Sequence, residues 1–438
     1  MVRLILTLFV AVAFNAIHNG AIMGQDFSVH LTSTNRLLRE PDKWFAGNIT
    51  NRPMLYWIGG WCVWFSHDKY PYQLASMLFT LSGAAALGFL HDATRRVIIS
   101  PLLRVTGLAL LAFLPLTVLT TVVYAADTVA LLPFVLAGWS VMRSLEQDSG
   151  PKAVGFAALA GVAFSIGDFA KATFLCLPAA VVFVLLALWR SGRLTAQRGW
   201  MLLALGVVLP SAVGGWVVAK CARQIAGEPE AHSFNWHGTG ELTFRSLVGV
   251  KVSDRRVLDA PEYLATEMRS GVQIYPLLIE NDYSYPALLH LGIFTDLLNV
   301  ANSAIVPRPE PQRTLARRTV RLGLVFSLGA LAAVLAFWGL TFRGFFRPSH
   351  MPSTAALVWS SLAMAWYVPI AGALPFVNHA YIMGYWLPRL VLPALWIFFL
   401  SLFAAADRLP GRWRGAAGVI LAILVPILSV LEIRSFWY

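Results

Sequence analysis

Long apolar stretches, each about 20 residues and nearly free of charge, recur along the whole chain, and as helices they are long enough to cross a membrane. The pattern predicts an all-α polytopic transmembrane fold. It includes an amphipathic first external loop and a large external loop between the seventh and eighth spans. The eleven predicted spans are 3–22, 73–91, 102–124, 128–142, 153–168, 172–189, 200–219, 321–341, 353–373, 386–406 and 415–434.

The composition agrees with lipid as the main solvent. Of the 438 residues, 58% are hydrophobic and only 13% are charged, whereas soluble domains carry about 25% charged residues. The formal net charge is +12. Its basic residues are spread over short loops and form no patch with aromatic residues, so a nucleic-acid partner is not expected. The three cysteines have unrelated spacings and indicate neither a disulfide framework nor a metal site.

The charges also predict an orientation, because cytoplasmic loops are enriched in lysine and arginine. With Arg3 in the cytoplasm, every short loop on that side is basic. The first segment lacks a clear cleavage site and is interpreted as a retained span. Arginine outnumbers lysine and alanine is abundant, a composition typical of GC-rich bacterial genomes, so we expect a bacterial inner membrane. The basic residues of the cytoplasmic loops would be Arg95, Arg96, Arg104, Arg143, Lys152, Arg190, Arg193, Arg198, Arg343, Arg347, Arg408, Arg412 and Arg414.

The opposite, extracytoplasmic face would receive the first external loop, two short turns, the large loop and a late loop. Segment 285–306, within the large loop, is long enough to cross. Crossing would bring an ionised aspartate to membrane depth and invert every later loop, so an interfacial or re-entrant helix is expected. The domain organisation predicted is a transmembrane catalytic module at 1–220, an extracytoplasmic loop with this helix at 221–320, and C-terminal transmembrane helices at 321–438.

The first external loop begins GQDFSVH and continues to NRPMLYW. Asp26 follows the first span directly, where a carboxylate either accepts a proton from an incoming acceptor or simply faces solvent at a helix end. His30 lies four residues later, as a supporting group or a structural one. Arg52 offers a planar donor fork that matches phosphate oxygens, or it anchors the chain among lipid headgroups.

Two further turns on this face carry charges. Asp127 opens the fourth span, where the helix dipole favours an acid. The alternative makes Asp127 a catalytic residue paired with Asp26, as a divalent-cation site or as two carboxylates that shape each other's basicity. Asp168 and Lys171 are spaced to form a salt bridge along a helix. In the alternative, Lys171 faces the same cavity as Asp127 and serves as a phosphate counter-charge.

The late loop HAYIMGYWLPR brings His379, Tyr385 and Arg389 to the external end of a span, either as membrane-interface anchors or as ligand contacts. Charge counting thus places acids, cations and aromatic residues on one face. A cleft with these groups beside a membrane would suit a lipid-linked phosphosugar.

The order of these motifs resembles the GT-C superfamily of membrane glycosyltransferases, which includes protein O-mannosyltransferases and the bacterial aminoarabinose transferase. The similar segments are GQDFSVH, NRPMLYW, AADTVALLPFVLAGW, AGVAFSIGDFAKATFLCLP and YWLPRLVLPAL. The resemblance covers the first 220 residues well and the last 60 loosely. Phe27 and Ser28 stand where relatives often add a second acid, and Met54 stands where many have a second proline.

The resemblance implies that Asp26 is the catalytic carboxylate, that Arg52 and Lys171 contact the donor phosphate, and that Tyr385 contacts the lipid phosphate. The function expected is hexosyl or pentosyl transfer from a polyprenyl-phosphate sugar to an external glycan, lipid or protein. No cofactor is required, although a divalent cation at Asp26 and Asp127 is left open. The alternatives are a transporter or flippase of lipid-linked saccharides and a non-catalytic envelope-assembly protein.

Overall fold

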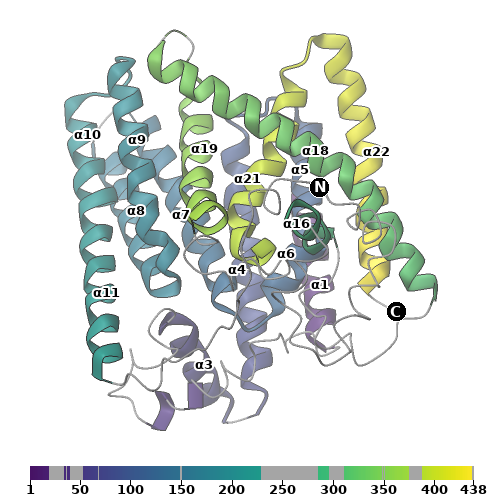
Figure 1. Ribbon diagram of the computed structural model, residues 1–438, viewed down its shortest axis with the longest axis horizontal. Helices are drawn as coiled ribbons and strands as arrows, with labels where there is room; N and C mark the ends of the chain where they lie inside the picture. Colours follow the sequence, from purple (N-terminus) through teal and green to yellow (C-terminus); the bar gives the residue numbers. More distant parts are fainter. Residues whose placement is uncertain are drawn as a thin grey trace.

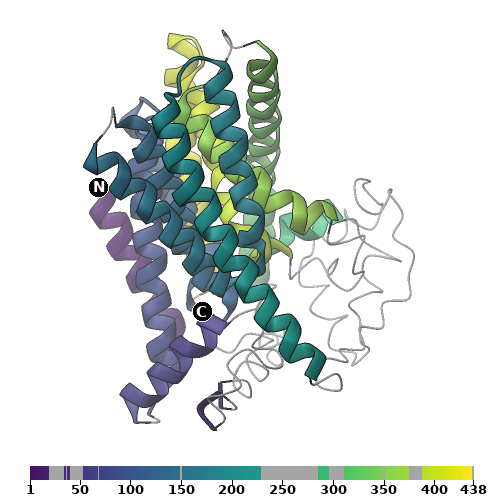
Figure 2. The same ribbon diagram turned by 90° about the vertical axis from the view of Figure 1, so that its left-hand side faces the viewer.

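The computed structural model describes residues 1–18, 34–35, 37–39, 53–67, 69–147, 150–227, 285–294, 310–347, 349, 351–373 and 387–436. Throughout these ranges the regular structure is helical, without strands. Most of the long helices run side by side and form one bundle (Figure 1 and Figure 2). The helices are α1 (Val2–His18), α3 (Pro53–Ser66), α4 (Pro71–Thr94), α5 (Pro101–Phe113), α6 (Pro115–Val122), α7 (Ala126–Glu146), α8 (Pro151–Ala170), η3 (Ala172–Cys176), α9 (Leu177–Arg190), α10 (Ala196–Leu203), η4 (Ala204–Val208), α11 (Leu209–Gly227), α16 (Tyr285–Phe294), α18 (Glu310–Phe346), α19 (Thr354–Tyr367), η9 (Val368–Ala373), α21 (Leu387–Asp407) and α22 (Gly411–Phe436).

The predicted polytopic membrane fold is confirmed. Within the described ranges, eight helices are long and apolar enough to cross a membrane, and the bent pair α5 and α6 makes a ninth. The first and ninth predicted spans correspond to two shorter apolar helices, Val2–His18 and Thr354–Ile370. Each predicted span therefore coincides with an apolar helix or helix pair, and the chain is an integral membrane protein.

Proline marks the start of several helices. Helices α3, α4, α5, α6 and α8 all begin at a proline, a residue that suits the first helical turn because its missing N–H would have no partner there. At Pro115 the chain instead bends by 55° between α5 and α6, since proline removes a hydrogen bond and crowds the preceding turn. The bend precedes the connection that leads into α7.

Two helices depart from the simple up-and-down arrangement. With 37 residues, α18 is about 55 Å long, and it runs obliquely across the bundle (Figure 1). The described part of segment 285–306 is α16, whose 10 residues span about 15 Å and are too short to cross the membrane. Its His290 is buried and bonds to Ser327 Oγ at 2.9 Å and to the Val320 carbonyl at 3.0 Å. This helix therefore packs on α18, and residues 295–306 lie outside the described ranges.

The short connections predicted to share the cytoplasmic side contact one another. The backbone N–H of Ile99, before α5, donates to the carboxylate of Asp407, at the end of α21, at 2.6 Å. Arg193, between α9 and α10, donates to the carbonyl of Pro352, before α19, at 2.9 Å. These contacts join connections that are far apart in sequence at one end of the bundle, which we call the basic end.

Candidate functional site

At the opposite end of the bundle, the predicted site residues Asp127 and Lys171 form an ion pair. Asp127 lies in the first turn of α7, as predicted, and its Oδ1 accepts a hydrogen bond from Lys171 Nζ. The two side chains are only 7% and 15% exposed. Lys171 directly follows α8 in an extended conformation and precedes η3, and its side chain turns toward α7.

The salt bridge between Asp168 and Lys171, the first of the two readings of this turn, is not formed. Lys171 has left the helix that would place the two side chains on one face. Asp168 is 5% exposed and faces α11, where a methyl group on Gly214 would come within 3.0 Å of its Cγ. Its Oδ2 has no hydrogen-bond partner. The structure therefore separates Asp168 from the ion pair.

Trp366 adds an aromatic face to the ion pair. Lys171 Nζ lies 5.7 Å from the centroid of the Trp366 ring, a distance at which an ammonium is attracted to the π-system. The indole is fully buried and donates to the Leu390 carbonyl at 2.9 Å. Sequence reasoning missed this residue, because nothing in its local sequence sets it apart from the other tryptophans of the chain, of which there are 16 in all.

A second network ties the predicted first external loop to the residues that precede α7. The buried Tyr124 hydroxyl donates to the Leu55 carbonyl at 3.0 Å and lies 3.0 Å from Thr34 Oγ1. It fits against Gly59 of α3, where an added Cβ would lie 1.9 Å from the hydroxyl oxygen. Burial raises the pKa of Tyr124 well above its ordinary value, so the phenol remains a donor. The loop and α3 are thus anchored three residues before Asp127.

The remaining predicted site residues lie mostly outside the described ranges. Arg389 belongs to α21, but its side chain is not described. Among the others, Arg52 directly precedes α3, and Asp26 lies eight residues before Thr34 in the sequence. In the described part of the chain, no group of three His, Cys, Asp or Glu residues could hold a metal ion. The predicted residues outside the described ranges are Asp26, His30, Arg52, His379 and Tyr385.

No family model and no curated protein match this chain. Among solved structures, it is similar to ArnT from Cupriavidus metallidurans bound to undecaprenyl phosphate, with a TM-score of 0.44 and 15% identity over 93% of this chain and 77% of that one. The apo state of the same protein gives a TM-score of 0.39 and 16% identity over 92% and 76% of the two chains. A likeness of this size does not establish a shared activity.

Proposed function

We propose that this protein is a membrane glycosyltransferase that moves a hexosyl or pentosyl group from a polyprenyl-phosphate donor to an extracytoplasmic glycan, lipid or protein. The buried ion pair of Lys171 and Asp127 is the observation that carries the proposal. Charged side chains within membrane proteins are rare because they lose hydration, and they usually mark functional sites. Here the pair joins the start of α7 to the end of α8, two apolar helices.

In this proposal Lys171 binds the donor phosphate. An ammonium has three donors. One is directed at Asp127, which holds the side chain in place, and the positive charge of the ammonium would attract the phosphate oxygens. Negative charge grows on the phosphate as the glycosidic bond breaks, so a fixed cation stabilises the transition state.

Arg52, Tyr385 and Arg389 are proposed as further contacts to the donor phosphate. For Arg52 the support is its position directly before α3, a helix that is hydrogen-bonded to Tyr124. One charge-assisted hydrogen bond contributes about 1.5–3 kcal/mol. Arg52→Ala should therefore weaken lipid-donor binding by about tenfold or more, measured as the dissociation constant in liposomes. Unchanged affinity would assign Arg52 to headgroup anchoring.

Asp26 is proposed as the general base. It would take the proton of the acceptor hydroxyl or amine while the acceptor attacks the anomeric carbon, and the bond from that carbon to the phosphate oxygen would break with inversion. The polyprenyl phosphate leaves and stays in the membrane. The anchoring of Thr34 to Tyr124 supports this role, because it fixes one residue of the predicted first external loop beside the residues that precede α7. His30, Asp168 and His379 are proposed as supporting residues.

Transfer of radiolabelled sugar by the purified protein in liposomes tests the proposal. Asp26→Asn keeps the size of the side chain but removes its basicity, so turnover should fall by about 10²–10⁴-fold while donor binding changes little. Asp42→Asn, in the same loop but outside the motif, is the matched control and should keep wild-type turnover. Wild-type turnover in Asp26→Asn would exclude the general base. Movement of intact donor across the bilayer without sugar transfer would instead indicate a flippase.

A further inference from the structure

The indole of Trp366 is held by three elements that surround the ion pair. Trp366 lies in the last turn of α19 and is fully buried. Its ring meets Phe134 of α7 and Phe174 of η3 in T-shaped contacts, each with ring centroids 5.2 Å apart. Its Nε1 donates to the Leu390 carbonyl, in the first turn of α21, at 2.9 Å. Edge-to-face contacts are favourable and fix the orientation of a ring, so the indole has one defined position.

Phe174 connects this indole to the turn that carries Lys171. Its backbone N–H donates to the Lys171 carbonyl at 3.1 Å. Its ring fills the space beside Gly167 of α8, where an added Cβ would lie 2.0 Å from a ring carbon. The ring can come this close because glycine has no side chain. The backbone around Lys171 is therefore tied to the aromatic residues that hold Trp366.

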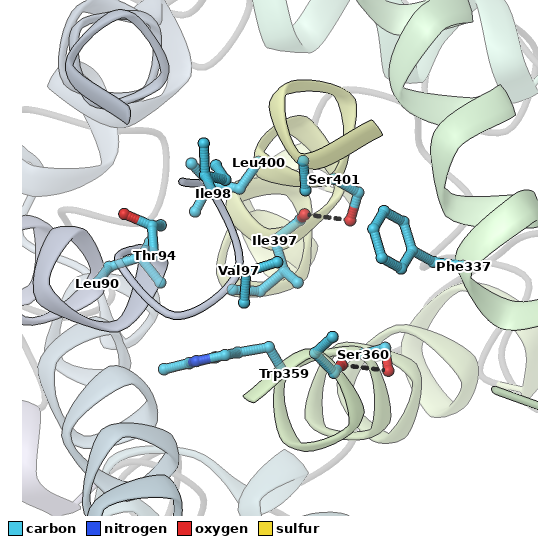
Figure 3. A pocket seen from close by; sticks show the side chains of 12 residues that line it. Leu90, Thr94, Val97, Ile98, Phe337, Trp359, Ser360, Ile397, Leu400 and Ser401 are labelled. Carbon is cyan, nitrogen blue, oxygen red and sulfur yellow. Dashed lines mark hydrogen bonds between the residues drawn. The ribbon is translucent and has the colours of Figure 1, made fainter. Parts of the chain in front are cut away.

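The position of α19 is fixed at a second point, seven residues before Trp366. Trp359 packs against Gly138 of α7, where an added Cβ would lie 2.7 Å from its ring. Since Phe134, the partner of Trp366, precedes Gly138, α19 and α7 run antiparallel. Trp359 and Ile397 of α21 line a space of only about 50 Å³ (Figure 3). With so little free volume around it, α19 presents Trp366 to the ion pair in a fixed position.

The ring of Trp366 also acts on the charge of the ion pair. Lys171 Nζ lies 5.7 Å from the ring centroid, and the same ammonium donates to Asp127 Oδ1. The attraction between a cation and an aromatic ring strengthens where water is excluded, and the Lys171 side chain is only 15% exposed. A ring attracts the ammonium without cancelling its charge, whereas a second carboxylate would cancel it. Trp366 thus restrains the ammonium and preserves its positive charge.

We propose that Trp366 is a positioning residue for sugar transfer, an inference that rests on the proposed function. Its ring holds the ammonium of Lys171 beside Asp127. Its N–H holds the start of α21, where Arg389 directly precedes Leu390. One side chain therefore sets the spacing between two segments that carry proposed phosphate contacts. Charges stabilise a transition state best when they are held in place before the reaction.

A comparison of two backgrounds tests the contact with the ammonium. Trp366→Leu is made in the wild type and in the double variant Asp127→Asn and Lys171→Met, which carries no charge at the pair. The substitution should raise the equilibrium constant of unfolding in mixed micelles by about tenfold more in the wild type, where alone it removes a ring from an ammonium. Trp396→Leu is the matched control and should have the same effect in both backgrounds. Trp396 is also fully buried and donates one hydrogen bond at 2.9 Å, to Thr117 Oγ1 of α6.

Transfer kinetics test the role in the reaction. Trp366→Phe keeps a ring but loses the donor to the Leu390 carbonyl, so the KM for the lipid-linked donor should rise by about fivefold. Trp366→Leu loses both contacts, and its kcat/KM should fall by about a further tenfold. Trp396→Phe and Trp396→Leu should keep the wild-type donor KM. A residue that only supports the fold changes the amount of active protein and leaves KM unchanged.

Two results would overturn the inference. One is an equal effect of Trp366→Leu on unfolding in the two backgrounds, and the other is a wild-type donor KM in both Trp366 variants. A wild type that transfers no sugar would instead reject the proposed function, and the unfolding comparison would then decide alone whether Trp366 holds the ammonium. If Trp366→Leu does not fold, Trp366→Met takes its place in both tests, because the flexible methionine side chain fills irregular spaces.

Discussion

The stability of the site depends on a pair of opposite charges that are both withdrawn from water. Removing one partner of such a pair leaves the other charge uncompensated, which lowers the free energy of unfolding by about 3–5 kcal/mol, whereas removing both is often close to neutral. Lys171→Met should therefore destabilise the protein strongly and abolish sugar transfer. The double variant Asp127→Asn and Lys171→Met should recover most of the stability, measured by equilibrium unfolding in mixed micelles, and remain inactive. Recovery of transfer by the double variant would assign the pair a purely structural role.

At the residue scale, we also propose Tyr124 as a positioning residue for the predicted first external loop. Tyr124→Phe removes the hydroxyl between Thr34 and the Leu55 carbonyl, which should lower the free energy of unfolding by about 1–3 kcal/mol. If the loop positions the general base, the rate constant kcat should fall while the donor KM stays near wild type. Tyr70→Phe is the control, because that side chain is 74% exposed. A fall in stability with unchanged kcat would show that the anchor supports only the fold.

At the scale of elements, the close approach of α3 to the start of α7 depends on a glycine. Gly59→Ala would place a Cβ 1.9 Å from the Tyr124 oxygen, and forcing extra volume into a packed site costs about 1–3 kcal/mol. Gly155→Ala in α8 is the matched comparison, since no atom lies within 4 Å of the added Cβ. We expect a lower thermal unfolding midpoint for Gly59→Ala and an equal or higher one for Gly155→Ala. Equal midpoints for the two variants would mean that α3 can move away from Tyr124 without loss of stability.

At the scale of the whole molecule, the grouping of the basic connections predicts an orientation. An impermeant thiol reagent applied to intact cells should label Gly240→Cys in the large loop and should not label Thr195→Cys at the basic end, once the native cysteines are replaced. Thr195 is exposed in the structure, so a failure of the reagent to label Thr195→Cys would mean that the membrane, and not burial within the protein, blocks access. Labelling of Thr195→Cys from outside would reverse the orientation and move the proposed site to the cytoplasm.

The sequence by itself determined which segments are spans and which connections meet at one end. A span satisfies its own backbone hydrogen bonds and is long and apolar, so its signal is local. The basic residues that mark alternate connections are also visible in the local sequence, and the contacts of Ile99 with Asp407 and of Arg193 with Pro352 show that such connections meet at one end of the bundle. The placement of Asp127 at the start of α7 could also be predicted, because helix-opening acids follow from local sequence.

Only the tertiary structure decided which charges and rings meet. Lys171 pairs with Asp127, 44 residues away, and not with Asp168 three residues before it. Trp366 approaches Lys171 from α19, and Tyr124 fits against Gly59 of α3. The small space beside Trp359 likewise needs helices from both halves of the chain. Hydrophobic periodicity describes the surroundings of one helix at a time, whereas these contacts depend on how helices distant in sequence pack against one another.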